Sequence, residues 1–399
     1  TRTQYGVNTD ITVDDHLRFL RTTTYDGNNH VVNRYSDVFG RLVLVREFTG
    51  NSGATYAAYA DTRYSYNVMG NLTAVNRSDP NDNNKLLWQT TMSYDAAGRK
   101  TAMTDPDMRE WAYTYGDEGN LSRQEHRSGA TVYHATCFYY DNLNRLLHRA
   151  NDATPANACP GSAPTTGANH LASYMYGAYV PGFNNGRLRE VSWGPNPAQN
   201  KDTFAYDAEG RLFRQTRIVN GRSFEQEVTA YDALDRPTKV KLPGGEIVIT
   251  GYDEEGVNTL KAGSTTLISG VGYNERGQLT SLGRPGSAPA TTLGYHGANR
   301  NFRLSAITTG GSTDIPDFSY GTYDLVGNLT QFADGTINHT YTYDEQNRLD
   351  TVKETAGQAI IRDYSYDQLG NFDTVTVDDQ TRDYTYAYGK PMRLMGVSN

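Results

Sequence analysis

Polar and apolar residues alternate in short runs along most of this chain. Tyr341-Thr342-Tyr343 and Asp363-Tyr364-Ser365-Tyr366 are examples, rich in aromatic and β-branched residues. A period of two residues with this composition predicts β-strands on a pleated, half-wetted surface. Each of these runs stops at a Tyr and is followed by a turn sequence. The chain is therefore predicted to be all-β and built from strand–turn–strand units.

One heptapeptide pattern marks the turns: Tyr-Asp-x-x-Gly-Arg-Leu, found from residue 35 to residue 372. From Tyr206 onward the copies begin about 20 to 28 residues apart, a spacing typical of arrays in which each unit packs only against its neighbours. We expect a single array over residues 1–399, strongest over 35–150 and 206–390, with an irregular loop insertion at about 147–175. The clear copies begin at Tyr94, Tyr206 and Tyr323, and looser ones at Tyr35, Tyr66, Tyr115, Tyr140, Tyr231, Tyr252, Tyr273, Tyr295, Tyr343 and Tyr366.

The residues of the pattern suit a tight hairpin corner. Asp favours the first position of a type I turn, and the Gly position requires a left-handed backbone. Where Gly is absent the chain has Asn144, Asn299, Asn347 or Asp235, the residue types that best tolerate positive φ. On this basis Gly210→Val is expected to destabilise the fold by a few kcal/mol, whereas Gly210→Asn is expected to be mild.

The predicted role of these corner residues is structural. The Arg is expected to pair with an Asp of its own or an adjacent copy, or to stack on a Tyr ring. The residues assigned to this turn motif are Tyr94, Asp95, Gly98, Arg99, Tyr206, Asp207, Gly210, Arg211, Tyr323, Asp324, Gly327, Tyr343, Asp344, Asn347, Arg348, Tyr366, Asp367 and Gly370.

The composition favours a thin sheet over a thick core. Of the 399 residues 37% are hydrophobic and 30 are Tyr, which supplies apolar area together with a hydroxyl for water. The net charge of −8, without a basic block, argues against nucleic-acid binding. No apolar run approaches the ~20 residues that a membrane helix requires, and the polar start does not resemble a signal peptide.

The two cysteines are predicted to form a disulfide. Cys137 lies in a predicted strand, and Cys159 lies in an irregular stretch, residues 151–169. A bond between them would pin this stretch to the strand and favours an oxidising compartment. The alternative is two unrelated free thiols.

The sequence offers no residue for a catalytic, cofactor-binding or metal-binding role. The eight histidines have no paired spacing typical of zinc sites. Asp79, Asn81 and Asn83 imitate a calcium loop, but Asn84 and Thr90 stand where Gly and Glu are needed. Phosphate-loop, dinucleotide and nucleophile motifs are absent. A non-enzymatic protein without a cofactor is expected.

The repeated motifs, such as Tyr206-Asp207 with Gly210-Arg211-Leu212, resemble those of the YD-repeat (Rhs-repeat) family over about residues 20 to 390. That family includes bacterial Rhs and wall-associated toxins, the cocoon-forming components of insecticidal Tc toxins, and animal teneurins. The resemblance implies a long β-sheet spiralling into a hollow shell or solenoid, which encloses a C-terminal effector in the toxins. The core-associated segment with its aspartyl self-cleavage site is not found here, so the resemblance implies neither self-cleavage nor toxin activity for this stretch.

Three functional hypotheses follow. The first is a structural shell segment of a secreted bacterial Rhs/Tc-type protein, encapsulating or presenting an effector that belongs to the same larger protein. The second is a secreted or cell-surface module that binds glycans through Trp88, Trp111 and Trp193, or forms filaments through its open strand edges; the Trp rings would otherwise pack between layers. The third, an enzyme using clustered carboxylates, is the weakest.

Overall fold

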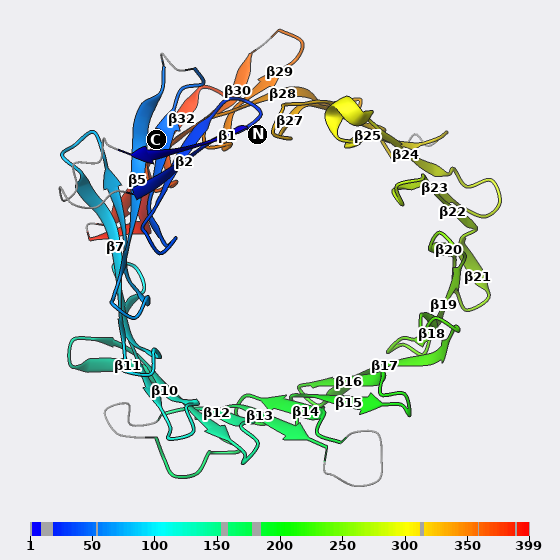
Figure 1. Cartoon of the computed structure of the whole chain (residues 1–399). Helices are drawn as coiled ribbons and strands as arrows, with labels where there is room; N and C mark the ends of the chain where they lie inside the picture. Colours follow the sequence, from blue (N-terminus) through cyan, green and yellow to red (C-terminus); the bar gives the residue numbers. More distant parts are fainter. Residues whose placement is uncertain are drawn as a thin grey trace. The chain divides into compact units, whose positions relative to one another are not determined.

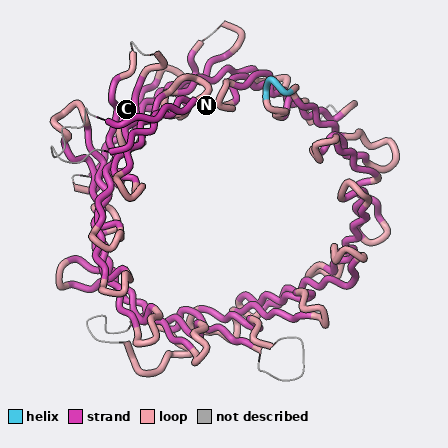
Figure 2. Tube along the Cα trace, viewed as in Figure 1, coloured by secondary structure: helices cyan, strands magenta, loops and turns pink. Residues whose placement is uncertain are grey.

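The protein is almost entirely β-structure, joined by turns and loops (Figure 2). This computed structural model describes residues 2–8, 19–52, 55–152, 159–177, 185–311, 315–357, 359–387 and 389–398. Within them the helical content is a single 3-10 turn, η1 (Ala298–Arg300). The all-β prediction is confirmed.

Residue contacts divide the chain into two compact units. Unit 1 comprises residues 1–109, 293–308 and 312–399, and unit 2 comprises residues 110–292 and 309–311. The expectation of one array over residues 1–399 stays a prediction. The strands of unit 1 are β1 (Arg2–Asn8), β2 (Phe19–Tyr25), β3 (Val31–Ser36), β4 (Leu42–Thr49), β5 (Ala57–Tyr66), β6 (Leu72–Asp79), β7 (Lys85–Tyr94), β8 (Lys100–Asp105), β25 (Leu304–Thr309), β26 (Phe318–Tyr323), β27 (Leu329–Ala333), β28 (Asn338–Tyr343), β29 (Leu349–Glu354), β30 (Ile360–Tyr366), β31 (Phe372–Val377), β32 (Gln380–Ala387) and β33 (Lys390–Ser398).

Unit 2 has the same kind of short strands. The irregular stretch falls between β12 and β13, and its residues 153–158 lie outside the described part. The strands of unit 2 are β9 (Arg109–Tyr115), β10 (Leu121–Ser128), β11 (Thr131–Tyr140), β12 (Leu146–Asn151), β13 (His170–Tyr176), β14 (Leu188–Trp193), β15 (Lys201–Tyr206), β16 (Leu212–Val219), β17 (Arg222–Tyr231), β18 (Pro237–Lys241), β19 (Ile247–Tyr252), β20 (Val257–Ala262), β21 (Thr265–Ile268), β22 (Gly270–Tyr273) and β23 (Leu279–Gly283). The unit boundaries fall within β24 (Thr291–Tyr295), after the first residue of β9 and before the last residue of β25.

Strands that follow one another in the sequence pair in antiparallel fashion, as β5 does with β6 and β16 with β17 (Figure 1). At the Tyr that ends a strand the register shifts by one residue, for example at Tyr66, Tyr206 and Tyr343. Such a shift is a β-bulge, with one extra residue on one strand. The predicted corners are therefore bulged hairpin turns.

The apolar interior is thin. The buried apolar residues of the described part are Val31, Tyr35, Leu44, Ala60, Val352 and Val375 in unit 1 and Ala135, Cys137, Ala150 and Ala172 in unit 2. Polar groups share this interior: the fully buried Asp61 carboxylate accepts two hydrogen bonds from Arg46 at 2.7 and 2.8 Å and one from Arg63 at 2.9 Å. A buried charge requires such pairing. Ion pairs thus contribute to a layer that has little room for large apolar side chains.

Within unit 1, strands from the two ends of the chain lie together, β2 and β5 beside β30 and β32 (Figure 1). The contacts join the corners of the late copies to the opposite ends of the early strands, which we call the far edge. Asn28 Nδ2 donates to the Asp324 carboxylate at 3.0 Å, and Gln368 Nε2 donates to the Tyr59 carbonyl at 2.8 Å. Two layers of hairpins therefore meet corner to far edge.

Candidate functional site

The corner after Tyr94 shows how the repeated residues shape the backbone. The Gly98 N–H donates to the Asp95 carbonyl at 3.0 Å, and Gly98 has a φ of 78°. One oxygen of the Asp95 carboxylate accepts the N–H groups of Ala97 and Arg99, and the other accepts Arg99 Nε at 2.7 Å. This is the geometry of a tight turn followed by a left-handed residue. One carboxylate holds both sides of the corner.

Asp207 and Asp344 are held in the same way. Arg211 Nε donates to Asp207 at 2.7 Å, and Arg348 Nε donates to Asp344 at 2.6 Å. Gly210, with a φ of 84°, closes the Asp207 corner. Partial desolvation acts to raise the pKa of the Asp207 carboxyl, but the hydrogen bonds from Arg211 outweigh it and hold the pKa below its ordinary value of 3.8. The Asp207 corner is built around an ionised aspartate.

Three of the four residues that replace Gly in the pattern have a left-handed backbone. Asn144, Asp235 and Asn347 have φ values of 60°, 60° and 61°. The expectation for Asn299 is wrong, because the Tyr295 copy forms the turn η1 and the left-handed residues are Asn301 and Phe302, each with a φ of 54°. The 3-10 turn thus moves the end of the corner further along the chain.

The Asp324 and Asp367 corners carry Asn where many other corners carry Arg. At the Asp324 corner, Gly327 has a φ of 112° and its N–H donates to the carboxylate at 2.6 Å, while Asn328 Nδ2 donates to the same group at 2.9 Å. At the Asp367 corner, Asn371 Nδ2 donates to the carboxylate at 2.8 Å. Asn thus replaces the Arg–Asp hydrogen bond of the turn, but it supplies no cation.

The Arg that follows a corner also stacks on the Tyr that opens the next copy. The guanidinium carbon of Arg211 lies 3.9 Å from the centroid of the Tyr231 ring, and that of Arg348 lies 4.4 Å from that of Tyr366. The sequence left open whether the Arg pairs with Asp or stacks on Tyr; these arginines do both. The same stacking joins Arg41 to Tyr66, Arg145 to Tyr176, Arg187 to Tyr206, Arg236 to Tyr252 and Arg303 to Tyr323.

The hydroxyl of the stacked Tyr adds a second link. Tyr366 Oη donates at 2.8 Å to the carbonyl of Leu349, the residue after Arg348. Burial raises the pKa of the Tyr366 phenol above 10.0. We call these Arg–Tyr stacks and Tyr hydroxyl bonds the tyrosine ladder. Tyr94 departs from it, with its hydroxyl 3.8 Å from Met92 Sδ. The same bond joins Tyr66 to Leu42, Tyr140 to Leu121, Tyr176 to Leu146, Tyr206 to Leu188, Tyr231 to Leu212, Tyr323 to Leu304 and Tyr343 to Leu329.

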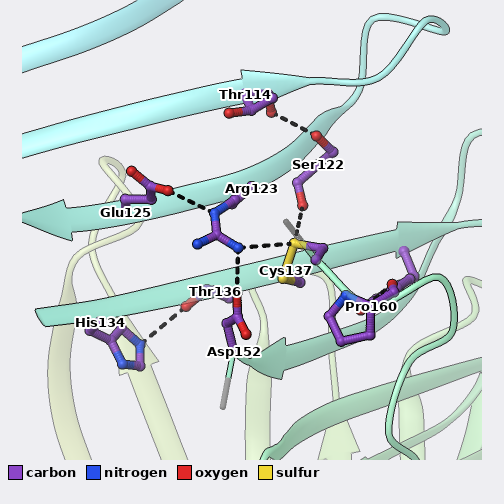
Figure 3. The surroundings of a disulfide bond; sticks show 11 residues. Thr114, Ser122, Arg123, Glu125, His134, Thr136, Cys137, Asp152 and Pro160 are labelled. Atoms are coloured by element: carbon purple, nitrogen blue, oxygen red, sulfur yellow. Dashed lines mark hydrogen bonds and ion pairs between the residues drawn. A yellow bond between two sulfur atoms is a disulfide. The ribbon is translucent and has the colours of Figure 1, made fainter. Parts of the chain in front are cut away.

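The two cysteines form a disulfide, with their Cα atoms 5.8 Å apart (Figure 3). Arg123 lies beside it, donating to the Asp152 carboxylate at 2.5 Å and to the Glu125 carboxylate at 2.8 Å. Arg123 and Asp152 are both buried. The Cys137–Cys159 bond ties the middle of the irregular stretch to β11, and the ion pair ties its start, at Asp152, to β10.

A histidine pair that the sequence did not reveal lies on β12 and β13. His170 Nδ1 is 2.6 Å from the Gly194 carbonyl, which can only accept, so Nδ1 carries a proton. In neutral His170, Nε2 then accepts from Ser173 Oγ at 2.8 Å, and Ser173 Oγ accepts from His148 Nδ1 at 2.8 Å. Desolvation, followed by the nearby His170, lowers the pKa of His148 below 6.5. The register of β12 with β13 brings these residues together, and no sequence motif predicts their contact.

Within the described ranges, no group of three or more His, Cys, Asp or Glu side chains could hold a metal ion. No helix in that part is long and apolar enough to cross a bilayer. The three tryptophans are all partly buried, and the Trp111 ring stacks on His126 with centroids 5.0 Å apart. The Trp111 ring therefore packs against a neighbouring side chain.

No protein-family model matches the chain, and no curated protein sequence matches it at a significant level. Solved structures do match. The crystal structure of TcdB2-TccC3 without its hypervariable C-terminal region gives a TM-score of 0.73 at 16% identity, over 94% of this chain and 21% of that chain. The crystal structure of TcdB2-TccC3 gives a TM-score of 0.71 at 16% identity, over 93% of this chain and 22% of that chain. The structure of the Photorhabdus luminescens Tc holotoxin pore with a TccC3 mutation gives 0.70 at 16% identity, over 94% and 21%.

This chain therefore spans about a fifth of the length of the chains it matches. At 16% identity the likeness establishes the fold. It confirms, at the level of the fold, the resemblance to YD-repeat shell proteins that the sequence motifs indicated.

Proposed function

We propose that this chain is a non-enzymatic wall segment of a secreted, toxin-type YD-repeat protein, and that it encloses or presents an effector. The tyrosine ladder is the observation that carries the proposal. A wall with water or cargo on one side cannot rely on a thick apolar core, so its copies must be joined by contacts that tolerate water. Arg–Tyr stacks and Tyr hydroxyl bonds are such contacts.

Two further observations support a wall. The likeness to Tc toxin structures extends over 94% of the chain. The disulfide between Cys137 and Cys159 is the kind of bond that persists in an oxidising, extracellular environment. The buried polar clusters have structural explanations: Asp61 is neutralised by two arginines, and Ser173 is enclosed between two imidazoles.

Limited proteolysis of the full-length gene product tests this function. We expect a segment outside residues 1–399 to resist a protease while the wall is intact, and to become cleavable when Arg211→Met and Arg348→Met weaken the ladder. Arg189→Met, at an exposed arginine on β14, is the matched control and should leave the protection intact. If the protease digests all segments outside residues 1–399 equally in the unmodified protein, the proposal is contradicted. A gene that encodes nothing beyond this chain would also contradict it.

A further inference from the structure

Unit 1 contains one complete example of a contact between two layers of hairpins. The corner tips, the two residues between Asp and Gly, face the far edge of the other layer. Glu345 accepts the Gly50 N–H at 3.0 Å, and Gln346 Nε2 donates to the Phe48 carbonyl at 3.1 Å. This contact defines how one layer of the array docks on another.

An apolar tip takes part in the same contact by lying against a glycine. A Cβ built on Gly27 would come within 2.8 Å of Leu325 Cβ and within 2.6 Å of the Leu325 carbonyl oxygen. Only a residue without a side chain leaves this space. A far-edge loop that contains Gly can therefore receive an apolar corner tip.

The corner tips of the first copies of unit 1 form an apolar row with no layer against it in the described part of the chain. Val38, Phe39, Val68 and Met69 make up this apolar tip row; Phe39 is 78% exposed and Met69 62%. Isolated exposed apolar residues are ordinary, but a contiguous patch indicates an interaction surface. The two corners are neighbours, because Arg41 lies over the Phe39 ring of the first at 5.1 Å, and its Nη1 lies 4.0 Å from the Cβ position of Gly70, which follows Met69 in the second.

The row carries no unpaired charge. Asp37 and Arg41 neutralise each other at 2.7 Å, and the second corner has Asn67 and Asn71 in the equivalent positions. These tips also lack the Gln and Glu side chains with which the late corners bond the far edge. Their partner is thus expected to be an apolar, glycine-containing edge rather than a polar one.

The far edge of the late copies offers such a partner. In the loop Asp334–Ile337, Ile337 is 40% exposed and no atom lies within 4 Å of the Cβ position of Gly335. The Asp334 carboxylate accepts the N–H groups of Thr336 and Ile337 at 3.0 and 2.6 Å, which fixes the loop. Like Gly27 in the existing contact, Gly335 directly follows the Asp that opens its turn.

We propose that a second copy of this chain docks here: the apolar tip row of one copy lies against the Asp334–Ile337 loop of the next. The contact continues, between molecules, the corner-to-far-edge contact already present inside unit 1. It joins two different surfaces, so each added copy leaves one free surface of each kind and the stack stays open. Both surfaces are held by their own turns, which keeps the ordering cost of docking low. The inference goes beyond the wall function and requires no enclosed effector.

Sedimentation velocity over a wide concentration range tests the proposal. The weight-average sedimentation coefficient of the unmodified chain should rise with concentration. Phe39→Asp and Ile337→Asp should each weaken association at least about tenfold, because each places a charge in an apolar contact. Leu143→Asp, at an exposed corner tip of unit 2, is the matched control and should associate as the unmodified chain does. Thermal unfolding confirms that each variant is folded.

Mixing the two variants gives the sharpest result. The Phe39→Asp chain keeps an intact loop and the Ile337→Asp chain keeps an intact tip row. Each alone should be monomeric, whereas an equimolar mixture should form dimers and nothing larger. A monomeric unmodified chain at every concentration overturns the proposal. So does association that both substitutions leave unchanged, as pairing of the outer strand edges would give, or a mixture that does not dimerise.

Discussion

Substitutions at Gly40 isolate the backbone requirement of a corner from its surroundings. Gly40 has a φ of 77°, and no atom lies within 4 Å of the position that a Cβ would occupy. A new side chain there therefore meets open space, and only its backbone preference counts. Asn tolerates this region, whereas a β-branched residue resists it at a cost of about 1–3 kcal/mol. We expect Gly40→Val to lower the free energy of unfolding by about 2 kcal/mol more than Gly40→Asn.

Gly210 differs from Gly40, because the Arg187 guanidinium occupies the position of its Cβ, which the sequence alone does not show. A Cβ there would lie 2.3 Å from Arg187 Nη2, and Arg187 also donates to the Gly210 carbonyl and stacks on Tyr206. Gly210→Asn must displace this guanidinium. It should therefore cost about 1 kcal/mol more than Gly40→Asn, the size of one hydrogen bond. The mild effect expected from sequence alone is revised accordingly.

Urea denaturation followed by tyrosine fluorescence measures these differences. Val and Asn are compared at the same position, so that partial unfolding of a repeat array affects both variants alike. Equal losses for Val and Asn at Gly40 would refute the left-handed corner. A Gly210→Asn variant as stable as Gly40→Asn would refute the role given to Arg187.

Three further predictions concern the ladder, the histidine pair and the disulfide. Tyr366→Phe removes the bond to the Leu349 carbonyl but keeps the ring, so it should lower the free energy of unfolding by about 1 kcal/mol in urea titrations, and Tyr366→Leu should lower it further. Because folding lowers the pKa of His148, its contribution to the stability of the fold should be fully present above pH 6.5 and decrease below it. In thermal melts, the melting temperature of His148→Gln should fall less at low pH than that of the unmodified chain. An equal fall in the two proteins would contradict this. Reductant should cost about 3 kcal/mol through the 22-residue separation that the disulfide closes, whereas a chain with both Cys137→Ala and Cys159→Ala should melt identically with and without it.

The features that were predictable from sequence are those decided within a few residues. Asp95 and Gly98 suit their positions through local turn chemistry, which any sheet context preserves. Asn299 fails because the Tyr295 copy closes as a 3-10 turn, an alternative that the residue types alone do not distinguish. Contacts that depend on strand register could not be predicted from the sequence. The hydrogen bonds of Ser173 with His148 and His170 are an example.

The layer contact was also beyond reach, because it joins residues such as Asn28 and Asp324 that are 296 positions apart in the chain. Neither residue has a motif that marks it as an interface. Only the path of all the intervening strands decides that these two meet.

The direction of the tyrosine ladder has a consequence for how genes of this kind change in length. Each arginine requires only that an aromatic residue open whatever hairpin comes next. Unequal recombination can remove or duplicate one whole hairpin pair. At the new junction the Arg of one corner again meets the Tyr that opens the next copy, so the stacking is kept. A break in mid-strand that adds or removes an odd number of residues would instead exchange the two faces of that strand. Selection should therefore tolerate length variation in complete units and remove the rest.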